Sequence, residues 1–354
     1  MTSTPPVTLE AIAPEAATTL PAIALTGFRA LVGDIGGNPA ALLAEAGIDP
    51  AAPDQPDGAI PLLALAVLLD RCAATLGCPD FAMRLAARQE ALRMIAPFER
   101  LYTHAPTLRE AFAWSALHNQ IYSTAIRVAT IHDTERQLYA QRYQLPGEGL
   151  PLFRQLAELV LLLSQDAVVA MSGGLIRSHE IWLSHPAIAS PAVYRAHFQA
   201  VVKFGQEFDG LFFTEADIDA RLIIADQAVF RSEQDLLSAR FPQRTADFAN
   251  RVREAIKELL AEDRCSRDEL AAWLNTSVST LHRRLGEIGH SFESLRDEVR
   301  RNLALRYLLC TDLPLTDVAA KLGYADPSVL TRSCRRWFDA APTAVRQGLT
   351  MVDR

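Results

Sequence analysis

Ser266-Arg-Asp-Glu-Leu-Ala-Ala-Trp-Leu-Asn-Thr-Ser-Val-Ser-Thr-Leu-His-Arg-Arg-Leu285 is the stretch that decides the fold of the C-terminal part of this 354-residue chain. Its apolar residues form two stripes at helical spacing, separated by a short polar break. The stripes are Leu270, Ala271 and Leu274, then Val278, Leu281, Leu285 and Ile288. Ser266 with Glu269 has the pattern of a capping box, and Ser277 can cap the second helix. Helices this short must pack on a third element, so the stretch predicts a helix-turn-helix at 266–288.

The same pattern returns about 45 residues later, in Leu315-Thr-Asp-Val-Ala-Ala-Lys-Leu322. Gly323 follows as a left-handed helix stop. Asp326 and Pro327 then supply a cap and a first-turn proline for a further helix. The repeat predicts a second helix-turn-helix at 315–338.

A long helix is expected between the two units, over 292–311, because its apolar residues form a continuous seam. Twenty residues at about 1.5 Å each span about 30 Å. That length is close to the ~34 Å that separates successive major-groove faces of B-form DNA. Arg300, Arg301 and Arg306 of this helix are expected to form a solvated or ion-paired face with Asp297 and Glu298.

This region resembles the DNA-binding domain of the AraC/XylS family of transcription regulators. The resemblance is carried by Leu281-His-Arg-Arg-Leu-Gly-Glu-Ile-Gly-His-Ser-Phe292, Arg300-Arg-Asn-Leu-Ala-Leu-Arg-Tyr-Leu308, Val318-Ala-Ala-Lys-Leu-Gly-Tyr324, Arg332, Arg335-Arg-Trp337 and Pro342. Ser279, Leu330 and Cys334 depart from the family pattern, which bears on the bases that are read rather than on the fold. The resemblance implies a DNA-binding regulator with promoter DNA and RNA polymerase as partners.

The candidate DNA-contacting residues lie on the second helix of each helix-turn-helix and face away from its apolar stripe. They are Ser279, Thr280, His282 and Arg283 in the first unit, and Ser328, Thr331, Arg332, Arg335 and Arg336 in the second. The fork of Arg283 matches O6 and N7 of guanine, a pair worth ~1–3 kcal/mol of discrimination. Thr331 and Arg332 match the family's Thr-Arg pair, whereas Arg335 and Arg336 suit phosphates. The alternative is a solvated helix face without contact to DNA.

The N-terminal part reads as α+β, with helices on an antiparallel sheet. Strands are expected at 124–132 and 137–143, as a hairpin, and at 180–183, 201–204 and 210–213. Helices are expected at 40–46, 62–76, 80–87, 107–118 and 152–171. Several pieces resemble the arabinose-binding-like N-terminal domain of some AraC-type regulators, whose members respond to varied small molecules. These pieces are Thr107-Leu-Arg-Glu-Ala111, His185-Pro186, Tyr194, Phe198, Val201-Val-Lys-Phe204 and Leu211-Phe-Phe213.

An effector pocket in this part would combine apolar walls with few polar groups. Its candidate residues are Tyr102, Arg109, Trp114, Tyr122, Arg127 and Phe153. The alternative is that these aromatic residues are ordinary core. The expected organisation is a flexible arm at 1–20, an α+β sensing and dimerisation domain at 21–225, a linker at 226–242 with a helical segment over 227–240, and the all-α DNA-binding domain at 243–354.

Charge is divided in the direction expected of a DNA-binding C-terminal domain, although the net charge is −7. From Phe241 onward there are 18 Lys and Arg against 16 Asp and Glu, whereas the preceding residues hold 17 against 26. No signal peptide and no apolar run of ~20 residues is visible, which predicts a soluble, cytoplasmic protein without a membrane partner. The five cysteines lack ligand spacing, so no metal or cofactor is expected.

The predicted function is a sequence-specific transcription regulator, an activator by family habit, that responds to a small-molecule effector, and a homodimer is expected as a partner arrangement. One alternative is a ligand-independent regulator whose N-terminal domain only dimerises. Another is an enzyme with DNA binding attached. The sequence argues against the enzyme, because it contains no Gly-rich phosphate loop, no H-E-x-x-H and no nucleophile elbow.

Overall fold

A computed structural model describes residues 19–95, 98–118, 126–145, 153–240, 246–262, 264–274, 276–311 and 313–348. The chain divides into two compact units, with the boundary between Pro242 and Gln243. The arm expected at 1–20 lies outside the described residues except for Thr19 and Leu20, which begin the first strand.

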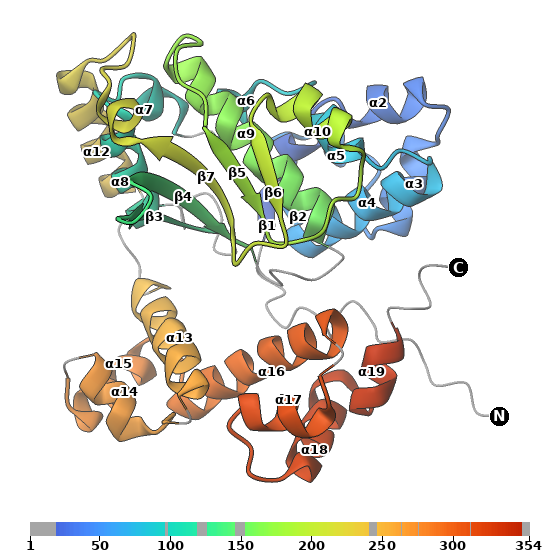
Figure 1. Cartoon of the computed structure of the whole chain (residues 1–354), viewed down its shortest axis with the longest axis vertical. Coiled ribbons are helices and arrows are strands. Elements are labelled where there is room, and N and C mark those ends of the chain that lie inside the picture. Colours follow the sequence, from blue (N-terminus) through green and yellow to red (C-terminus); the bar gives the residue numbers. More distant parts are fainter. Residues whose placement is uncertain are drawn as a thin grey trace. The chain divides into compact units, whose positions relative to one another are not determined.

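The N-terminal unit is built on a five-stranded sheet with the order β3-β4-β7-β5-β6 (Figure 1). Its strands are β3 Arg127–Asp133, β4 Leu138–Gln144, β5 Glu180–Leu183, β6 Val201–Phe204 and β7 Asp209–Thr214. The register pairs Gln141 of β4 with Leu211 of β7, and Leu211 with Ile181 of β5. Leu211 and Ile181 are fully buried, so one face of the central strands forms part of the core.

Helices cover this face and build the rest of the unit. They are α2 Phe28–Asp34, α3 Pro39–Glu45, α4 Leu62–Thr75, α5 Phe81–Ala86, α6 Ala91–Met94, α7 Glu99–Thr103, α8 Leu108–His118, α9 Arg154–Met171, α10 Pro191–Phe198, α11 Glu215–Asp219 and α12 Gln227–Arg240, with 3-10 helices η1 Ala22–Leu25 and η2 Ala52–Asp54. The central helix α9 packs on α4, α5, α6 and β7, and α8 packs on β3. The α9 face toward these neighbours is apolar, with Leu156, Leu159 and Leu162 buried.

The α+β class predicted from the sequence is confirmed, but the sheet is not purely antiparallel. β5 and β6 run parallel, with Glu180 opposite Val201, because α10 lies between them in the chain and supplies the crossover that parallel neighbours need. A second, two-stranded sheet pairs β1 Thr19–Pro21 with β2 Ala59–Pro61. Strands of three residues leave no alternation to detect, and the sequence did not predict them.

The segment 226–242, expected as a linker, contains α12. Its Phe230 and Leu237 are buried, and α12 packs against α7. Arg100 of α7 and Glu233 of α12 form an ion pair at 2.9 Å. The described part of this segment therefore belongs structurally to the N-terminal unit.

The C-terminal unit is all helical, as predicted. Its helices are α13 Ala246–Ala261, α14 Arg267–Trp273, α15 Val278–Glu287, α16 Phe292–Cys310, α17 Leu315–Lys321, α18 Pro327–Phe338 and α19 Pro342–Gly348. A first core joins α13, α14 and α15 to the N-terminal half of α16, through Val252, Leu270, Leu281 and Leu295. A second group of buried residues lies on the C-terminal half of α16 and on α17, α18 and α19; it includes Ala304, Leu308, Val318, Leu330, Phe338 and Val345. Within the described ranges, none of the helices combines the length and the apolar character needed to span a bilayer.

Candidate functional site

Helix α15 presents a polar face to solvent because its apolar stripe is buried. Leu281 and Leu285 are each 2% exposed and belong to the first core of the C-terminal unit. Ser277 caps the helix by accepting a hydrogen bond from the backbone N–H of Thr280 at 3.2 Å. The opposite face exposes Ser279, His282 and Arg283, with Thr280 half-buried at its edge.

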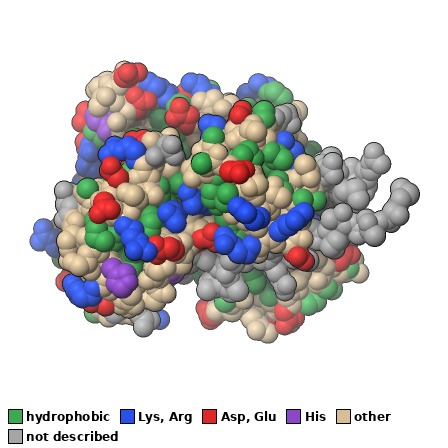
Figure 2. All heavy atoms as spheres, turned by 90° about the horizontal axis from the view of Figure 1, so that it is seen from below, with side chains coloured by type: hydrophobic (Ala, Val, Ile, Leu, Met, Phe, Trp, Pro, Cys, Tyr) green, Lys and Arg blue, Asp and Glu red, His purple; other side chains and the backbone are tan. Residues whose placement is uncertain are grey.

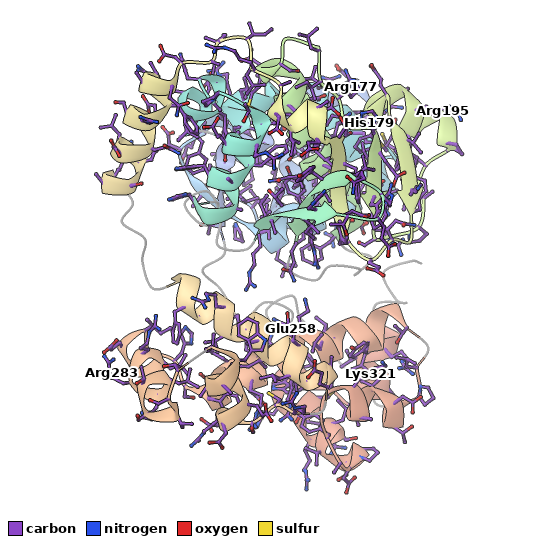
Figure 3. All side chains as sticks on the ribbon, turned by 60° about the vertical axis from the view of Figure 1, so that its left-hand side comes forward. Arg177, His179, Arg195, Glu258, Arg283 and Lys321 are labelled. Carbon is purple, nitrogen blue, oxygen red and sulfur yellow. The ribbon has the colours of Figure 1, made fainter. Side chains whose placement is uncertain are left out.

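Arg283 extends into solvent from α15 (Figure 3). Its side chain is 65% exposed, and Nη1 forms an ion pair with Glu287 Oε1 at 2.6 Å. An exposed i, i+4 pair of this kind is worth only about 0.3–0.5 kcal/mol. The guanidinium can therefore leave Glu287 for a stronger partner at small cost.

Helix α18 repeats this arrangement in the second helix-turn-helix. Leu330 and Cys334 are fully buried, while Ser328, Arg332 and Arg335 are exposed and Thr331 is half-buried. The Asp326 carboxylate caps the helix by accepting from the backbone N–H of Ser328 at 2.7 Å. This backbone hydrogen bond holds the pKa of Asp326 below its usual value.

Arg336 differs from the other predicted contacts on α18 because it already has a carboxylate partner. It forms an ion pair with Asp297 of α16, and the other Asp297 oxygen accepts from Trp337 Nε1 at 2.9 Å. Arg336 thus fastens α18 to α16. The structure brings Ser328, Thr331, Arg332 and Arg335 together on one helix, with Arg336 beside them.

Helix α18 packs on the long helix α16, and the buried residues of α15 belong to the same core as the N-terminal half of α16. The 19 residues of α16 at about 1.5 Å each give a length of about 28 Å. Figure 2, a view from below, shows Lys and Arg side chains spread among Asp and Glu. A face of mixed charge agrees with the near-balance of basic and acidic residues in this part of the sequence.

Several arginines here have structural contacts that spacing did not predict. Arg284 lies over the Phe248 ring, 3.9 Å from its centroid. Arg300 donates to the carbonyls of Leu322 and Gly323 at 2.8 and 3.0 Å, and Arg301 is only 9% exposed. The expectation of a solvated or ion-paired face is therefore wrong for Arg300, because the second helix-turn-helix packs over this part of α16. Arg301 is not solvated, but it interacts electrostatically with Asp297 and Glu298. The side chain of Arg306 lies outside the described residues.

The N-terminal unit contains a partly open cavity of about 140 Å³. Side chains of α8 and α9 meet those of β3, β4, α6, α7 and the segment around β1 at its wall. The wall is apolar except for six side chains with polar groups, namely Gln89, Tyr102, Ser115, Gln141, Tyr143 and Ser164. Tyr102 and Ser115 share a hydrogen bond at 2.9 Å, and burial raises the pKa of Tyr102 to about 12.

Of the six candidate effector residues, Tyr102 lines this cavity. Trp114 packs edge-on against Tyr102, with ring centroids 6.3 Å apart, but it is not part of the wall. Phe153 is buried outside the wall, and Arg127 is half-buried on β3. Tyr122 lies outside the described residues.

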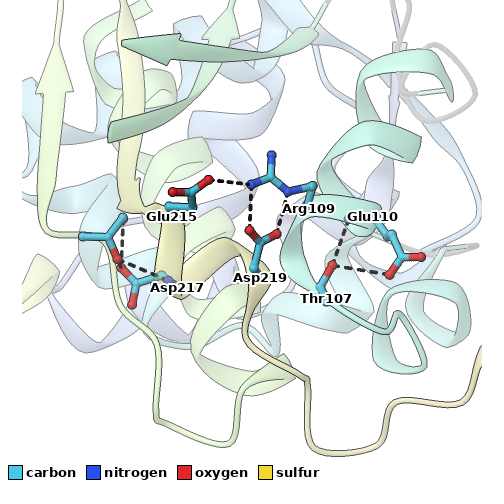
Figure 4. Close-up of polar contacts among 7 residues, drawn as sticks. Thr107, Arg109, Glu110, Glu215, Asp217 and Asp219 are labelled. Atoms are coloured by element: carbon cyan, nitrogen blue, oxygen red, sulfur yellow. Dashed lines mark hydrogen bonds and ion pairs between the residues drawn. The ribbon is translucent and has the colours of Figure 1, made fainter. Parts of the chain in front are cut away.

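Arg109, the remaining candidate, lies at the surface and joins α8 to α11 (Figure 4). Its Nε and Nη2 donate to the two oxygens of Asp219 at 2.5 and 2.8 Å. The guanidinium also lies over the Tyr139 ring, 4.7 Å from its centroid. The bidentate pair lowers the pKa of Asp219, so Arg109 serves here as a link between elements.

A group of three polar side chains is buried beside α9, outside the cavity wall. Tyr194 donates to Glu158 Oε1 at 2.5 Å, and His185 Nε2 lies 3.9 Å from the same oxygen. Desolvation raises the pKa of Glu158 to about 8 and lowers that of His185 to about 4. The pair is therefore largely neutral near pH 7 and does not form an ion pair. Within the described residues, no group of three or more His, Cys, Asp or Glu is placed to hold a metal ion.

Comparison with known proteins relates both units to one group of proteins. Residues 36–222 match the family described as the arabinose-binding domain of AraC transcription regulator, N-terminal, and residues 270–348 match a helix-turn-helix domain family. The HTH-type transcriptional regulator VirS of Mycobacterium tuberculosis is 29% identical over 327 residues, which cover 91% of this chain and 94% of VirS. The ornithine utilization regulator of Pseudomonas aeruginosa is 23% identical over 90% of this chain and 93% of its own. The crystal structure of the transcriptional regulator CdpR from P. aeruginosa covers 87% of this chain and 96% of its own, with 22% identity and a TM-score of 0.42.

Proposed function

Since the chain belongs to the AraC family of DNA-binding transcription regulators, we propose that it is an activator whose N-terminal domain responds to a small-molecule effector. The observation that carries the effector half of this proposal is the mainly apolar cavity of the N-terminal unit. Apolar cavities with a few polar groups are the usual form of small-molecule sites. In this proposal residues 21–225 sense the effector and residues 243–354 bind promoter DNA.

For DNA binding, α15 and α18 are the proposed recognition helices. Arg283, which is exposed and paired with Glu287, is assigned to a base edge, together with Ser279, Thr280 and His282. On α18, Thr331 and Arg332 are assigned to bases, and Ser328, Arg335 and Arg336 to the phosphate backbone. The ~28 Å length of α16 supports engagement of neighbouring major grooves, because one turn of B-form DNA measures ~34 Å.

Regulation requires the effector to favour one state of the protein over another. A ligand shifts an equilibrium only by its difference in affinity for the two states. We propose that the occupied cavity favours the state that engages promoter DNA and RNA polymerase, and that the N-terminal domain also forms a homodimer.

The test begins with selection of bound duplexes from a random-sequence pool by the full-length protein. A single enriched motif with two half-sites about one helical turn apart is expected. Transcription from a promoter with this motif should rise when the effector is added. Enrichment of no motif at low salt would refute sequence-specific binding, and a motif with transcription that falls on effector addition would refute activation.

The alternative is a ligand-independent regulator whose N-terminal domain only dimerises. Thermal unfolding with a metabolite collection separates the two functions. A ligand that binds only the native state stabilises it by ~2.7 kcal/mol at a hundredfold excess over its Kd. A protein that only dimerises would show a melting temperature that depends on protein concentration and on none of the metabolites.

A further inference from the structure

We infer that the cavity of the N-terminal unit takes an uncharged, mainly hydrophobic ligand of about benzene size that carries one hydrogen-bond donor, and that it does not take a sugar or a carboxylate. This inference rests on the proposed effector function and names the chemical class of the effector. It starts from the volume. A cavity of about 140 Å³ is close to an engineered apolar cavity of ~150 Å³ that binds benzene.

The wall excludes charged ligands. No Asp, Glu, Lys, Arg or His is among the described side chains that line the cavity. The segments at 1–18, 96–97, 119–125 and 146–152, which lie outside the described residues, contain no Lys or Arg in their sequence. A carboxylate would thus lose its hydration without gaining a cation, which costs several kcal/mol.

Most polar groups of the wall already have hydrogen-bond partners within the protein, so they cannot replace the water that hydrates a sugar. Tyr102 and Ser115 bond to each other at 2.9 Å. Gln141 Oε1 accepts from Thr130 at 2.9 Å. A pentose carries four hydroxyl groups, and each one buried without a partner is penalised. Apolar ring carbons match this wall better.

Gln89 supplies the group that would recognise the hydrogen-bond donor of the ligand. Its Nε2 donates to the carbonyls of Ala24 and Thr26 at 2.9 and 3.0 Å, which fixes the orientation of the amide. Its Oε1 is buried and has no hydrogen-bond partner in the described part of the chain. The other side chains with buried, unpartnered atoms are not part of the cavity wall. A ligand hydroxyl or N–H would satisfy this acceptor, since an unmade buried hydrogen bond is costly.

Four probes of similar size separate these features: toluene, benzyl alcohol, benzoate and L-arabinose. Titration calorimetry and thermal unfolding would use the full-length protein. Toluene and benzyl alcohol should bind and raise the melting temperature by a few degrees, with benzyl alcohol about 5- to 10-fold tighter. Benzoate and L-arabinose should bind at least about tenfold more weakly than toluene.

Two kinds of variant test the placement. Gln89→Leu should remove the preference for benzyl alcohol while toluene still binds, which separates loss of the acceptor from loss of the fold. Ala111→Met and Val160→Phe, which fill the cavity from α8 and α9, should abolish binding of both aromatic probes. Folding of each variant is checked by its unfolding transition.

Tighter binding of benzoate or L-arabinose than of toluene would overturn the inference, as would failure of all four probes to bind the folded wild-type protein. Aromatic binding that both filling variants leave unchanged would overturn it as well. DNA binding is measured on the same preparations with the selected motif. Absence of DNA binding would refute the proposed function. Binding of the wrong ligand class by a protein that still binds DNA would refute this inference alone.

Discussion

Arg300 closes the end of α17 by donating its guanidinium to two backbone carbonyls. Nε bonds to the Leu322 oxygen at 2.8 Å and Nη2 to the Gly323 oxygen at 3.0 Å. The guanidinium also lies over the Tyr324 ring, 4.5 Å from its centroid. These carbonyls belong to the C-cap residue and to the residue that follows it, directly after the last turn of the helix, where backbone oxygens lack an intrahelical partner. One side chain of α16 thereby positions the first helix of the second helix-turn-helix.

We expect Arg300→Ala to destabilise the C-terminal unit by about 1.5–3 kcal/mol, because it removes charge-assisted hydrogen bonds from half-buried carbonyls. Arg300→Lys should restore only part of this, since an ammonium lacks the planar fork. Chemical denaturation followed by far-UV circular dichroism measures the change. Arg332→Ala, at an exposed position, is the control and should stay within about 0.5 kcal/mol of the wild type. Equal loss in both variants would contradict the assigned role.

Substitutions of Arg283 and Arg335 test whether one exposed arginine contacts a DNA base and the other a DNA phosphate. Arg283→Ala should cost about 1–3 kcal/mol at one base pair of the selected motif and relax the preference there. Arg335→Ala should weaken all sequences alike and reduce the slope of log Kd against log salt by about 1. Fluorescence polarisation with single-base variants of the motif, at several salt concentrations, measures both. Uniform weakening by Arg283→Ala would instead make it a phosphate contact.

The exposure of single residues was predictable from the sequence where helical spacing alone decides it. The outward set on α15 follows from the burial of Leu281 and Leu285 on the opposite face. The cavity was not predictable in the same way, because its wall is assembled from elements far apart in the chain. Tyr102 is a lining residue that the sequence suggested, whereas Gln89 carried no signal. Its orientation depends on the Ala24 and Thr26 carbonyls, which sequence does not place.

Among the elements, α16 depends on a reciprocal cap at its start. Ser291 accepts from the backbone N–H of Ser294 at 3.0 Å, and Ser294 Oγ accepts from the backbone N–H of Ser291 at 2.9 Å. Such a box satisfies two of the donors that every helix start leaves without a partner. The N-terminal half of α16 carries Leu295 and Val299 into the first core. The cap therefore stabilises the helix that packs against α18 and shares the first core with α15.

Ser291→Ala should lower the free energy of unfolding of the C-terminal unit by about 0.5–2 kcal/mol, because the orphan N–H of Ser294 loses its acceptor. Ser291→Asp should retain most of the stability, since Asp is also a good N-cap. Ser279→Ala, on the exposed face of α15, is the matched control for loss of a serine hydroxyl. Thermal unfolding of the three variants measures the ranking. A Ser291→Ala variant as stable as Ser279→Ala would show that this cap is dispensable.

At the scale of elements, the sequence predicted the long periodic helices and several short strands, but it missed α11 in spite of the Thr214–Asp217 capping box. The bounds expected for β5, β6 and α12 agree with the structure. The short helices α6 and α7 were not predicted, and neither has a side-chain hydrogen bond at its N-cap. Their apolar residues, such as Met94 and Leu101, are buried by tertiary contacts and not by an amphipathic repeat. Elements of this kind form because neighbours cover them, which local pattern does not reveal.

At the scale of the whole molecule, the buried carboxyl group of Glu158 makes the stability of one unit, the N-terminal one, depend on pH. It lies in the N-terminal unit, fully buried, with Tyr194 as donor, and the carboxylates of Asp80 and Asp209 contribute to raising its pKa. Its pKa rises from the ordinary 4.5 to about 8, chiefly through desolvation. The folded state therefore keeps a proton that the unfolded state releases above about pH 5. Each unit of pKa difference corresponds to about 1.4 kcal/mol.

We expect the stability of the N-terminal unit to fall as pH rises from about 5 to 8, since the folded state binds more protons in that range. His185, with its pKa lowered to about 4, acts in the opposite direction only below its ordinary value of 6.5. Between pH 6.5 and 8 the effect of Glu158 thus stands apart from that of His185. Glu158→Gln imitates the protonated acid and should flatten the pH dependence of the N-terminal transition. Differential scanning calorimetry at pH 6.5, 7.25 and 8, with the exposed Glu207→Gln as control, measures it, and a Glu158→Gln transition that still falls like the wild type would show that another group holds the proton.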